Sequence, residues 1–345
     1  MTQRVRYEAL DGLRGLAAIG VLCFHLSIIG LPVATHGYLA VDFFFMLSGF
    51  VIAHAYSRKL DALAWPDFAK LRFIRVLPLS AAGLLAGTSY FVVRYLSQPQ
   101  SQYSLDNILL GTAFNVFLIP KPWITDTPTD TIFATNTPLW SLSVEIVVNL
   151  VWAAFFFRSK WPAILSVALG SAVVLIVFIQ AAGSADLGAT WPTYLGGMSR
   201  SVFSYFTGVF IWSFRQKPDK SSLYPSISAV FLIAIIFTPD MGPYFDILAI
   251  TLVFPALIYL ASTADFRTER PIFKFIGNLS YPLYVIHVPI LMFFAGFAKG
   301  LKIEAWTYLI AALSSVTAIL VAIALDRLYD RPARRLLTRL FVAPR

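Results

Sequence analysis

The sequence predicts an all-α, polytopic membrane helix bundle, and three observations support this prediction. Apolar residues make up 58% of the 345 residues and charged residues only 13%, whereas about a quarter of a soluble domain is charged. Apolar segments of membrane-spanning length recur along the chain, and lysine and arginine gather in alternate loops between them. We expect about ten transmembrane helices, short interfacial helices, and both termini in the cytoplasm.

The chain shows no feature that divides it into parts. No low-complexity tract, proline- or glycine-rich linker or short repeat interrupts it, so residues 1–345 are expected to form a single integral membrane domain. Arg14 and His25 interrupt the first apolar segment, which predicts a retained helix and not a cleaved signal peptide. The single cysteine, Cys23, cannot form an intrachain disulfide.

Ten segments are apolar over windows of about 19 residues. Segment 105–119 is also apolar, but it is short and flanked by polar loops, so we expect it to be interfacial or re-entrant and not to cross. The ten expected spans lie near 12–31, 37–57, 76–95, 138–157, 163–182, 200–214, 222–238, 245–262, 280–298 and 305–326.

The distribution of cationic residues supports this topology. With ten spans, 22 of the 27 lysines and arginines fall on the side that holds both termini, and cytoplasmic loops carry such an excess. The formal charge of +9 then reflects topology and attraction to anionic lipid or to an anionic cytoplasmic ligand, so no nucleic acid is expected as a partner. The five cations on the outer side are Arg94, Lys121, Arg200, Lys299 and Lys302.

Three polar side chains share one face of the first apolar helix. Arg14 follows Asp11 by three residues and precedes His25 by eleven, and eleven residues at about 100° each return to within roughly 20° of the same face. At about 1.5 Å per residue, His25 lies roughly 16 Å above Arg14, near mid-bilayer. Ionisable groups are costly in hydrocarbon, so the stripe indicates a functional site, although a lone histidine can also be a satisfied packing residue.

Polar side chains also occur at the outer ends of two other expected spans. Ser141, Glu145 and Asn149 recur at intervals of four residues behind Trp140, which places them on one helix face. A buried carboxylate such as that of Glu145 needs a partner. Asp42 opens the second apolar segment and either caps that helix or belongs to the polar interior.

A further polar stripe is expected in the segment 280–298. Ser280, Tyr284 and His287 follow one another at intervals of four and three residues, again on one helix face. Pro282 and Pro289 bracket this stripe and can kink the helix or free backbone carbonyl groups.

A mixed aromatic and basic segment, 65–78, precedes the third span and carries Lys70, Arg72 and Arg75. This composition favours an amphipathic element on the cytoplasmic face. Two interpretations stay open: ordinary topology signalling, or three fixed cations that bind the phosphates of a nucleotide-bearing ligand near Arg14.

Six segments, taken in order, resemble the motifs of one known family, the acyltransferase 3 family of bacterial membrane O-acyltransferases. Each fragment is weak alone, but each lies in the expected span or loop, and together they cover nearly the whole chain. They are LDGLRGLAA at 10–18 with His25, GYLAVDFFFMLSGFVI at 37–52, Arg72 with Arg75 and Pro78, WSLSVE at 140–145, GNLSYPLY at 277–284 with His287 and Pro289, and YDRP at 329–332.

The resemblance implies an acyl-CoA-dependent O-acyltransferase in the bacterial inner membrane. Family members move an acyl group, commonly acetyl, from cytoplasmic acyl-CoA to a hydroxyl of a carbohydrate such as an exopolysaccharide, a lipopolysaccharide or a lipid-linked glycan. The implied partners are the coenzyme A thioester, the carbohydrate and the bilayer, and no metal is expected. The closing motif often has Glu where this chain has Asp330, and a chain ending at Arg345 leads us to expect no extra hydrolase-like domain.

The candidate residues divide by expected role. We hypothesise that Arg14, Arg72 and Arg75 bind the coenzyme A phosphates, that His25 acts as general base or, less favoured, forms an acyl-histidine, and that Glu145 orients the imidazole. Trp140, Trp123 and Trp191 are either stacking surfaces for sugars or membrane anchors. The residues expected to support the site or the acceptor are Asp11, Asp42, Trp140, Ser141, Tyr284 and His287.

The rival interpretation is a proton-coupled transporter of a small solute or glycan precursor, since intramembrane His, Glu and Arg also build relays. Transporters usually contain two related halves, and the stripe from Arg14 to His25 has no counterpart in the second half. The sequence leaves open the acyl chain, the acceptor and its side of access, the choice between a general base and an acyl-enzyme, and the oligomeric state, a homodimer included.

Overall fold

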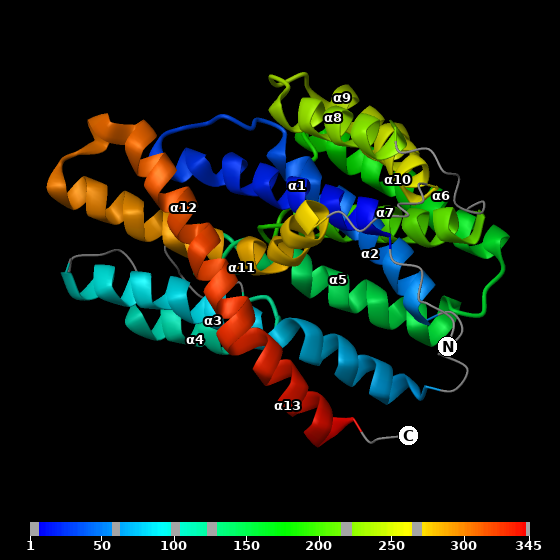
Figure 1. The fold of residues 1–345 in the computed structure, drawn as a ribbon, viewed down its shortest axis with the longest axis horizontal. Helices are drawn as coiled ribbons and strands as arrows, with labels where there is room; N and C mark the ends of the chain where they lie inside the picture. Colours follow the sequence, from blue (N-terminus) through cyan, green and yellow to red (C-terminus); the bar gives the residue numbers. More distant parts are fainter. Residues whose placement is uncertain are drawn as a thin grey trace.

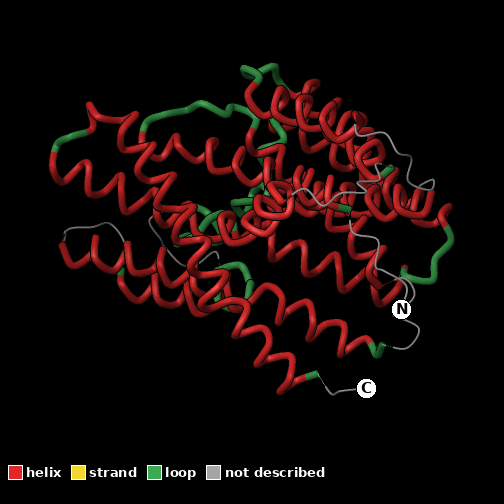
Figure 2. Tube along the Cα trace, in the orientation of Figure 1, coloured by secondary structure: helices red, strands yellow, loops and turns green. Residues whose placement is uncertain are grey.

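The computed structural model describes residues 7–56, 63–97, 104–122, 130–214, 223–263 and 271–342. Within these ranges the chain consists of helices and loops, and a single bridged pair, Thr131 with Thr190, is the only strand-like pairing (Figure 2). The prediction of an all-α fold is therefore confirmed.

The helices of the described residues follow the apolar segments closely. They are α1 (Glu8–His25), α2 (Ala40–Tyr56), α3 (Trp65–Ser97), α4 (Leu105–Asn115), α5 (Leu139–Val151), α6 (Trp161–Ala182), α7 (Tyr194–Phe214), α8 (Leu223–Phe237), α9 (Pro243–Leu248), α10 (Phe254–Ser262), α11 (Pro271–Leu301), α12 (Thr307–Leu325) and α13 (Arg331–Phe341).

Eight helical stretches in the described part of the chain are long and apolar enough to cross a membrane, so the protein is a multi-pass membrane protein. The remaining two expected spans correspond to α7, which carries several serines and Arg200, and to α8, which has 15 residues. The count of ten thus stays a prediction. Helix α4 has 11 residues, or about 16 Å, which is half of a hydrocarbon core of about 30 Å.

Two ends of the bundle can be distinguished by the contacts that they contain. We call the end where α1 begins the near end; α3 and α11 also begin there, because Arg14 contacts Gly277 and Tyr281 contacts Val76. The far end holds the loops before α2 and before α7. Figure 1 shows α12 and α13 continuing as one diagonal line across the bundle, and α13 packs against α3.

Glycines allow the closest helix pairs to form. Helices α2 and α7 pack together, and a Cβ added to Gly208 of α7 would collide with the backbone of Met46, just as one added to Gly49 of α2 would collide with the backbone of Tyr205. Small residues at such crossings let helix backbones approach in a membrane. The α2–α7 crossing matters for the site because these helices carry Asp42 and Arg200.

We predict that Gly208→Ala destabilises the protein, because the added methyl group overpacks the α2–α7 crossing at a cost of about 1–3 kcal/mol. The measurement is the apparent Tm of the purified protein in detergent, which should fall. Gly170→Ala in α6 is the matched control, since a Cβ added there would meet nothing within 4 Å and alanine favours the helix by about 0.5–1 kcal/mol. Equal Tm values for the two variants would contradict the close crossing.

Candidate active site

Two histidines from different helices face one another inside the bundle. His25 is the last residue of α1, and His287 lies near the middle of α11. The Nε2 atom of His287 is 3.2 Å from Nδ1 of His25, and the ring centroids are 4.9 Å apart. Both residues were expected on polar stripes, and the structure brings the two stripes together.

The hydrogen bonds of the pair assign the protons. Nδ1 of His25 lies 2.9 Å from the carbonyl oxygen of Val21, and Nδ1 of His287 lies 3.0 Å from that of Leu283. A carbonyl oxygen only accepts, so each Nδ1 carries the proton and donates it. His287 Nε2 then has a lone pair for the Nδ1–H of His25, and Nε2 of His25 keeps a lone pair that makes no hydrogen bond with the described residues.

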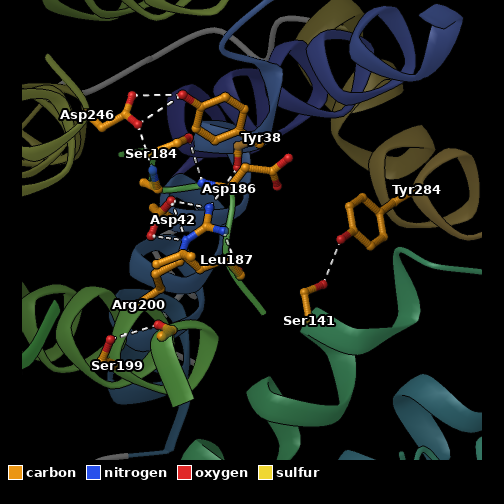
Figure 3. Close-up of polar contacts among 12 residues, drawn as sticks. Tyr38, Asp42, Ser141, Ser184, Asp186, Leu187, Ser199, Arg200, Asp246 and Tyr284 are labelled. Atoms are coloured by element: carbon orange, nitrogen blue, oxygen red, sulfur yellow. Dashed lines mark hydrogen bonds and ion pairs between the residues drawn. The ribbon is translucent and has the colours of Figure 1, made fainter. Parts of the chain in front are cut away.

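A hydroxyl pair extends this site toward α5. The hydroxyl groups of Tyr284 and Ser141 are 2.6 Å apart (Figure 3), and Tyr284 also donates to the carbonyl of Pro138. The Tyr284 ring lies 6.0 Å from that of His287, and both side chains are buried. Four of the expected residues, on three helices, thus form two hydrogen-bonded pairs, His25 with His287 and Tyr284 with Ser141, and the ring contact between Tyr284 and His287 places the pairs side by side.

Arg14 joins α1 to α11 at the near end. Its guanidinium donates to Ser280 Oγ and to the carbonyl of Gly277, both at 2.9 Å, and lies 3.0 Å from Asp11. The side chain of Arg14 is one-third exposed. Arg14 and His25 thus both contact α11, which confirms that they share one face of the first helix.

Arg75, one of the two expected arginines of α3, lies beside the same turn of α11. Arg75 covers the ring of Tyr281 at 4.6 Å, and Tyr281 follows directly after Ser280. Arg75 lies 3.9 Å from Asp330, while Arg72 lies 3.5 Å from Glu145. Arg14 and Arg75 thus contact the first turns of α11, and Arg72 lies one helical turn before Arg75 on α3. Each of the three has a carboxylate nearby, and we call them the arginine cluster.

The expected pairing of Glu145 with His25 is wrong. Glu145 accepts a hydrogen bond from Ser48 Oγ at 2.5 Å and pairs with Arg72, so it belongs to the arginine cluster. The partners of His25 are Val21 and His287. Glu145 was expected at the histidine because both lie on polar stripes, and stripes alone do not say which helices are neighbours.

A buried ionic network occupies the far end. Arg200 and Asp42 are fully buried and approach to 2.6 Å, and Arg200 also donates to the carbonyl groups of Tyr38 and Leu187. Asp246 accepts from the hydroxyl of Tyr38 and from the backbone N–H of Ala185 (Figure 3). Asp42 therefore belongs to the polar interior as an ion-pair partner.

Sequence reasoning did not single out Arg200 or Asp246, although a signal existed for the first. Arg200 stands at the outer end of one expected span and Asp42 at the outer end of another. A membrane interior favours pairing of such charges between helices. Nothing comparable identified Asp246 or Ser48, which become partners only through the helix arrangement.

Trp140 is not a stacking surface for a ligand. Its side chain is 6% exposed, with Arg200 5.6 Å from its ring and Phe45 6.2 Å away edge-on. Trp191 is half-buried and donates to the carbonyl of Lys121. Trp123 lies outside the described residues, which also contain no group of three or more His, Cys, Asp or Glu placed to hold a metal ion.

Comparisons with known proteins support the resemblance to the acyltransferase family. Residues 7–325 match a family model described as an acyltransferase domain. Protein 2 in picA locus of Rhizobium radiobacter is 36% identical over 181 residues, which cover 50% of this chain and 94% of that protein. No solved structure gives a significant match.

Two relatives with informative names match over most of the chain. The peptidoglycan O-acetyltransferase OatA of Listeria monocytogenes is 25% identical over 385 residues, covering 97% of this chain and 58% of the relative. The O-acetyltransferase OatA of Staphylococcus aureus is 26% identical over 364 residues, covering 94% and 57%. The chain therefore spans little more than half the length of these two relatives.

We predict that the Asp42–Arg200 pair is strongly coupled. Arg200→Met leaves a buried carboxylate without its cation and should cost about 3–5 kcal/mol, whereas the double variant Asp42→Leu with Arg200→Met should lose less than that single variant. The measurement is a double-mutant cycle of apparent Tm values, completed with Asp42→Leu. Additive losses would show that the two charges do not compensate one another.

Proposed function

Because the chain belongs to the acyltransferase family whose domain it matches over residues 7–325, we propose that it is a membrane O-acyltransferase that uses acyl-CoA to acylate a carbohydrate hydroxyl. The acyl group proposed is acetyl, since curated relatives are named as O-acetyltransferases. The observation that carries the proposal is the histidine pair: His25 has a proton-accepting nitrogen and stands on the same helix face as Arg14.

The proposal places the near end on the cytoplasmic side of a bacterial inner membrane. The excess of lysine and arginine in the loops at that end supports this orientation. It puts the arginine cluster on the side where acyl-CoA is made, while His25 lies about 16 Å farther along α1. A pantetheine arm extending inward from the cluster would bridge this distance.

The arginine cluster fits the phosphates of coenzyme A. Nε of Arg72 and Nη1 of Arg75 are buried without a hydrogen-bond acceptor among the described residues, so the cluster has donors to spare. Guanidinium groups bind phosphate oxygens through such donors, often in pairs. We assign Arg14, Arg72 and Arg75 to donor binding; in the structure they lie beside Asp11, Glu145 and Asp330, respectively.

The histidine pair supplies the proton transfers of the reaction. The thioester supplies an activated acyl carbon, which the acceptor oxygen attacks as the carbon–sulfur bond breaks. His25 Nε2 accepts the proton of the acceptor hydroxyl and returns it to the departing sulfur. During this exchange Nδ1–H of His25 stays bonded to Val21 and His287, which stabilises the imidazolium form. His287 thus takes the orienting role first expected of Glu145.

The hydroxyl chain provides a second element of the proposed chemistry. Tyr284 stands beside His287 and is fixed by Ser141 and the carbonyl of Pro138. We assign the hydroxyl pair of Tyr284 and Ser141 as the neutral donor that stabilises the oxyanion forming on the acyl carbon.

We predict that His25→Ala lowers kcat for acetyl transfer by about 10²- to 10⁴-fold, because the general base is removed. The assay is release of coenzyme A from acetyl-CoA by the purified protein, together with mass spectrometry of glycans from cells that express each variant. His54→Ala, which removes a half-buried histidine at the near end of α2, is the control and should keep activity. Turnover by His25→Ala at the wild-type rate would exclude the base.

We predict that Arg75→Ala weakens binding of coenzyme A by about 10- to 100-fold, through loss of charge-assisted hydrogen bonds worth about 1.5–3 kcal/mol. Arg14→Ala should act in the same direction. Titration calorimetry with coenzyme A measures the Kd, and Arg94→Ala at the opposite end of α3 serves as the control. An unchanged Kd for Arg75→Ala and Arg14→Ala would place the donor elsewhere.

A further inference from the structure

The far-end loop between α6 and α7 presents one carboxylate that the ionic network does not use. Ala185 and Leu187 are buried, and the network holds their backbones: Ala185 N–H donates to Asp246 at 2.7 Å, and the carbonyl of Leu187 accepts from Arg200 at 2.8 Å. Asp186 stands between them with its side chain exposed. The Asp186 carboxylate makes no hydrogen bond or ion pair with the described residues.

The loop is held rigidly enough to fix the direction of Asp186. The backbone N–H of Asp186 donates to Ser184 Oγ at 3.1 Å. Gly188 has a φ of +119°, and a side chain there would collide with the ring of Trp140, so the loop lies directly on that tryptophan. Burying an arginine and carboxylates in a membrane protein costs free energy. The α6–α7 loop, which Arg200 and Asp246 both contact, carries Asp186.

Two contact chains connect this loop with the histidine pair. One chain begins at Asp246, which accepts hydrogen bonds from Ala185 of the loop and from Tyr38. The Tyr38 ring packs against Phe24 at 5.9 Å, and Phe24 packs against His25 at 5.0 Å. The other chain begins at Trp140, on which Gly188 of the loop lies. The next residue, Ser141, hydrogen-bonds to Tyr284, and the Tyr284 ring contacts His287. The loop therefore lies over the site from the far end.

Asp186 is directed toward this site. The Asp186 carboxylate lies within electrostatic range of His25, as it does of Tyr38 and Arg200. In Figure 3 the Asp186 side chain extends away from Arg200, on the side where Tyr284 and Ser141 lie. Arg200 is already neutralised by Asp42, so the carboxylate of Asp186 remains available for a ligand.

We propose that Asp186 binds the acceptor: its carboxylate accepts hydrogen bonds from hydroxyl groups of a carbohydrate that approaches from the far end, and so holds one hydroxyl toward His25. Two carboxylate oxygens accept from two neighbouring hydroxyls, as a sugar ring presents them. The same charge repels carboxylated sugars, so the acceptor is a neutral or amino sugar. This inference rests on the proposed function and adds the side of access and the acceptor class.

The test compares Asp186→Asn with wild type on the glycan that gains an acyl group in cells expressing the wild-type chain. With that glycan isolated in its unacylated form, Asp186→Asn should raise the KM for the glycan by about 10- to 100-fold, because a charged acceptor is lost. The KM for acetyl-CoA and the hydrolysis of acetyl-CoA without glycan should stay unchanged. Asp186→Glu should recover most of the affinity.

Asp240→Asn is the matched control, since Asp240 is an exposed carboxylate in the next far-end loop, before α9, and accepts one backbone hydrogen bond. It should leave both KM values unchanged. An Asp186→Asn variant with a wild-type KM for the glycan, or with a loss confined to kcat, would overturn the inference while leaving the proposed function intact. If the wild-type chain acylates no glycan, the proposed function fails and the inference fails with it.

Discussion

The seam between α1 and α11 is the contact on which the rest of the site depends. Added Cβ atoms at Gly15 and Gly277 would meet the backbone of the opposite helix, so the two helices approach closely. Arg14 and His25 then find their partners on α11 at two levels of the same seam. Because hydrocarbon offers no hydrogen-bond partners, these two contacts also fix the register of one helix against the other.

The near end shows how a cluster of cations is stabilised inside a membrane protein. Each arginine assigned to donor binding lies beside a carboxylate, Asp11, Glu145 or Asp330. Paired charges avoid most of the cost of leaving a buried ion alone. The pairs at Arg72 and Arg75 are long, at 3.5 and 3.9 Å, which leaves guanidinium donors for phosphate oxygens.

The two ends of the bundle have different electrostatic designs, and the proposed reaction uses both. Cations with unused donors suit an anionic donor at the near end, whereas the far-end arginine is sealed by Asp42 and holds a loop in place. The histidine pair lies between them. Under the proposed function, a thioester from one side and a hydroxyl from the other meet at His25, and neither substrate has to cross the whole bilayer.

The sequence by itself determined the helices, the membrane class and most of the polar residues of the site. A continuous apolar segment of spanning length can satisfy its backbone within itself in lipid only as a helix, and each of the ten expected segments contains one. Helical spacing also placed Arg14 with His25, and Tyr284 with His287, on common faces. Four of the six family motifs overlap these segments, and the other two, at Arg72 with Arg75 and at 329–332, lie beside them.

Only the tertiary structure decided which polar faces meet. It paired His25 with His287 and not with Glu145, buried Trp140 beneath a loop, and joined Arg200 to Asp42 across 158 residues of sequence. Helical periodicity specifies the direction of a side chain about its own axis, but the neighbour that it meets depends on how helices distant in the sequence pack. That choice comes from the close glycine crossings and from the need of each buried charge for a partner.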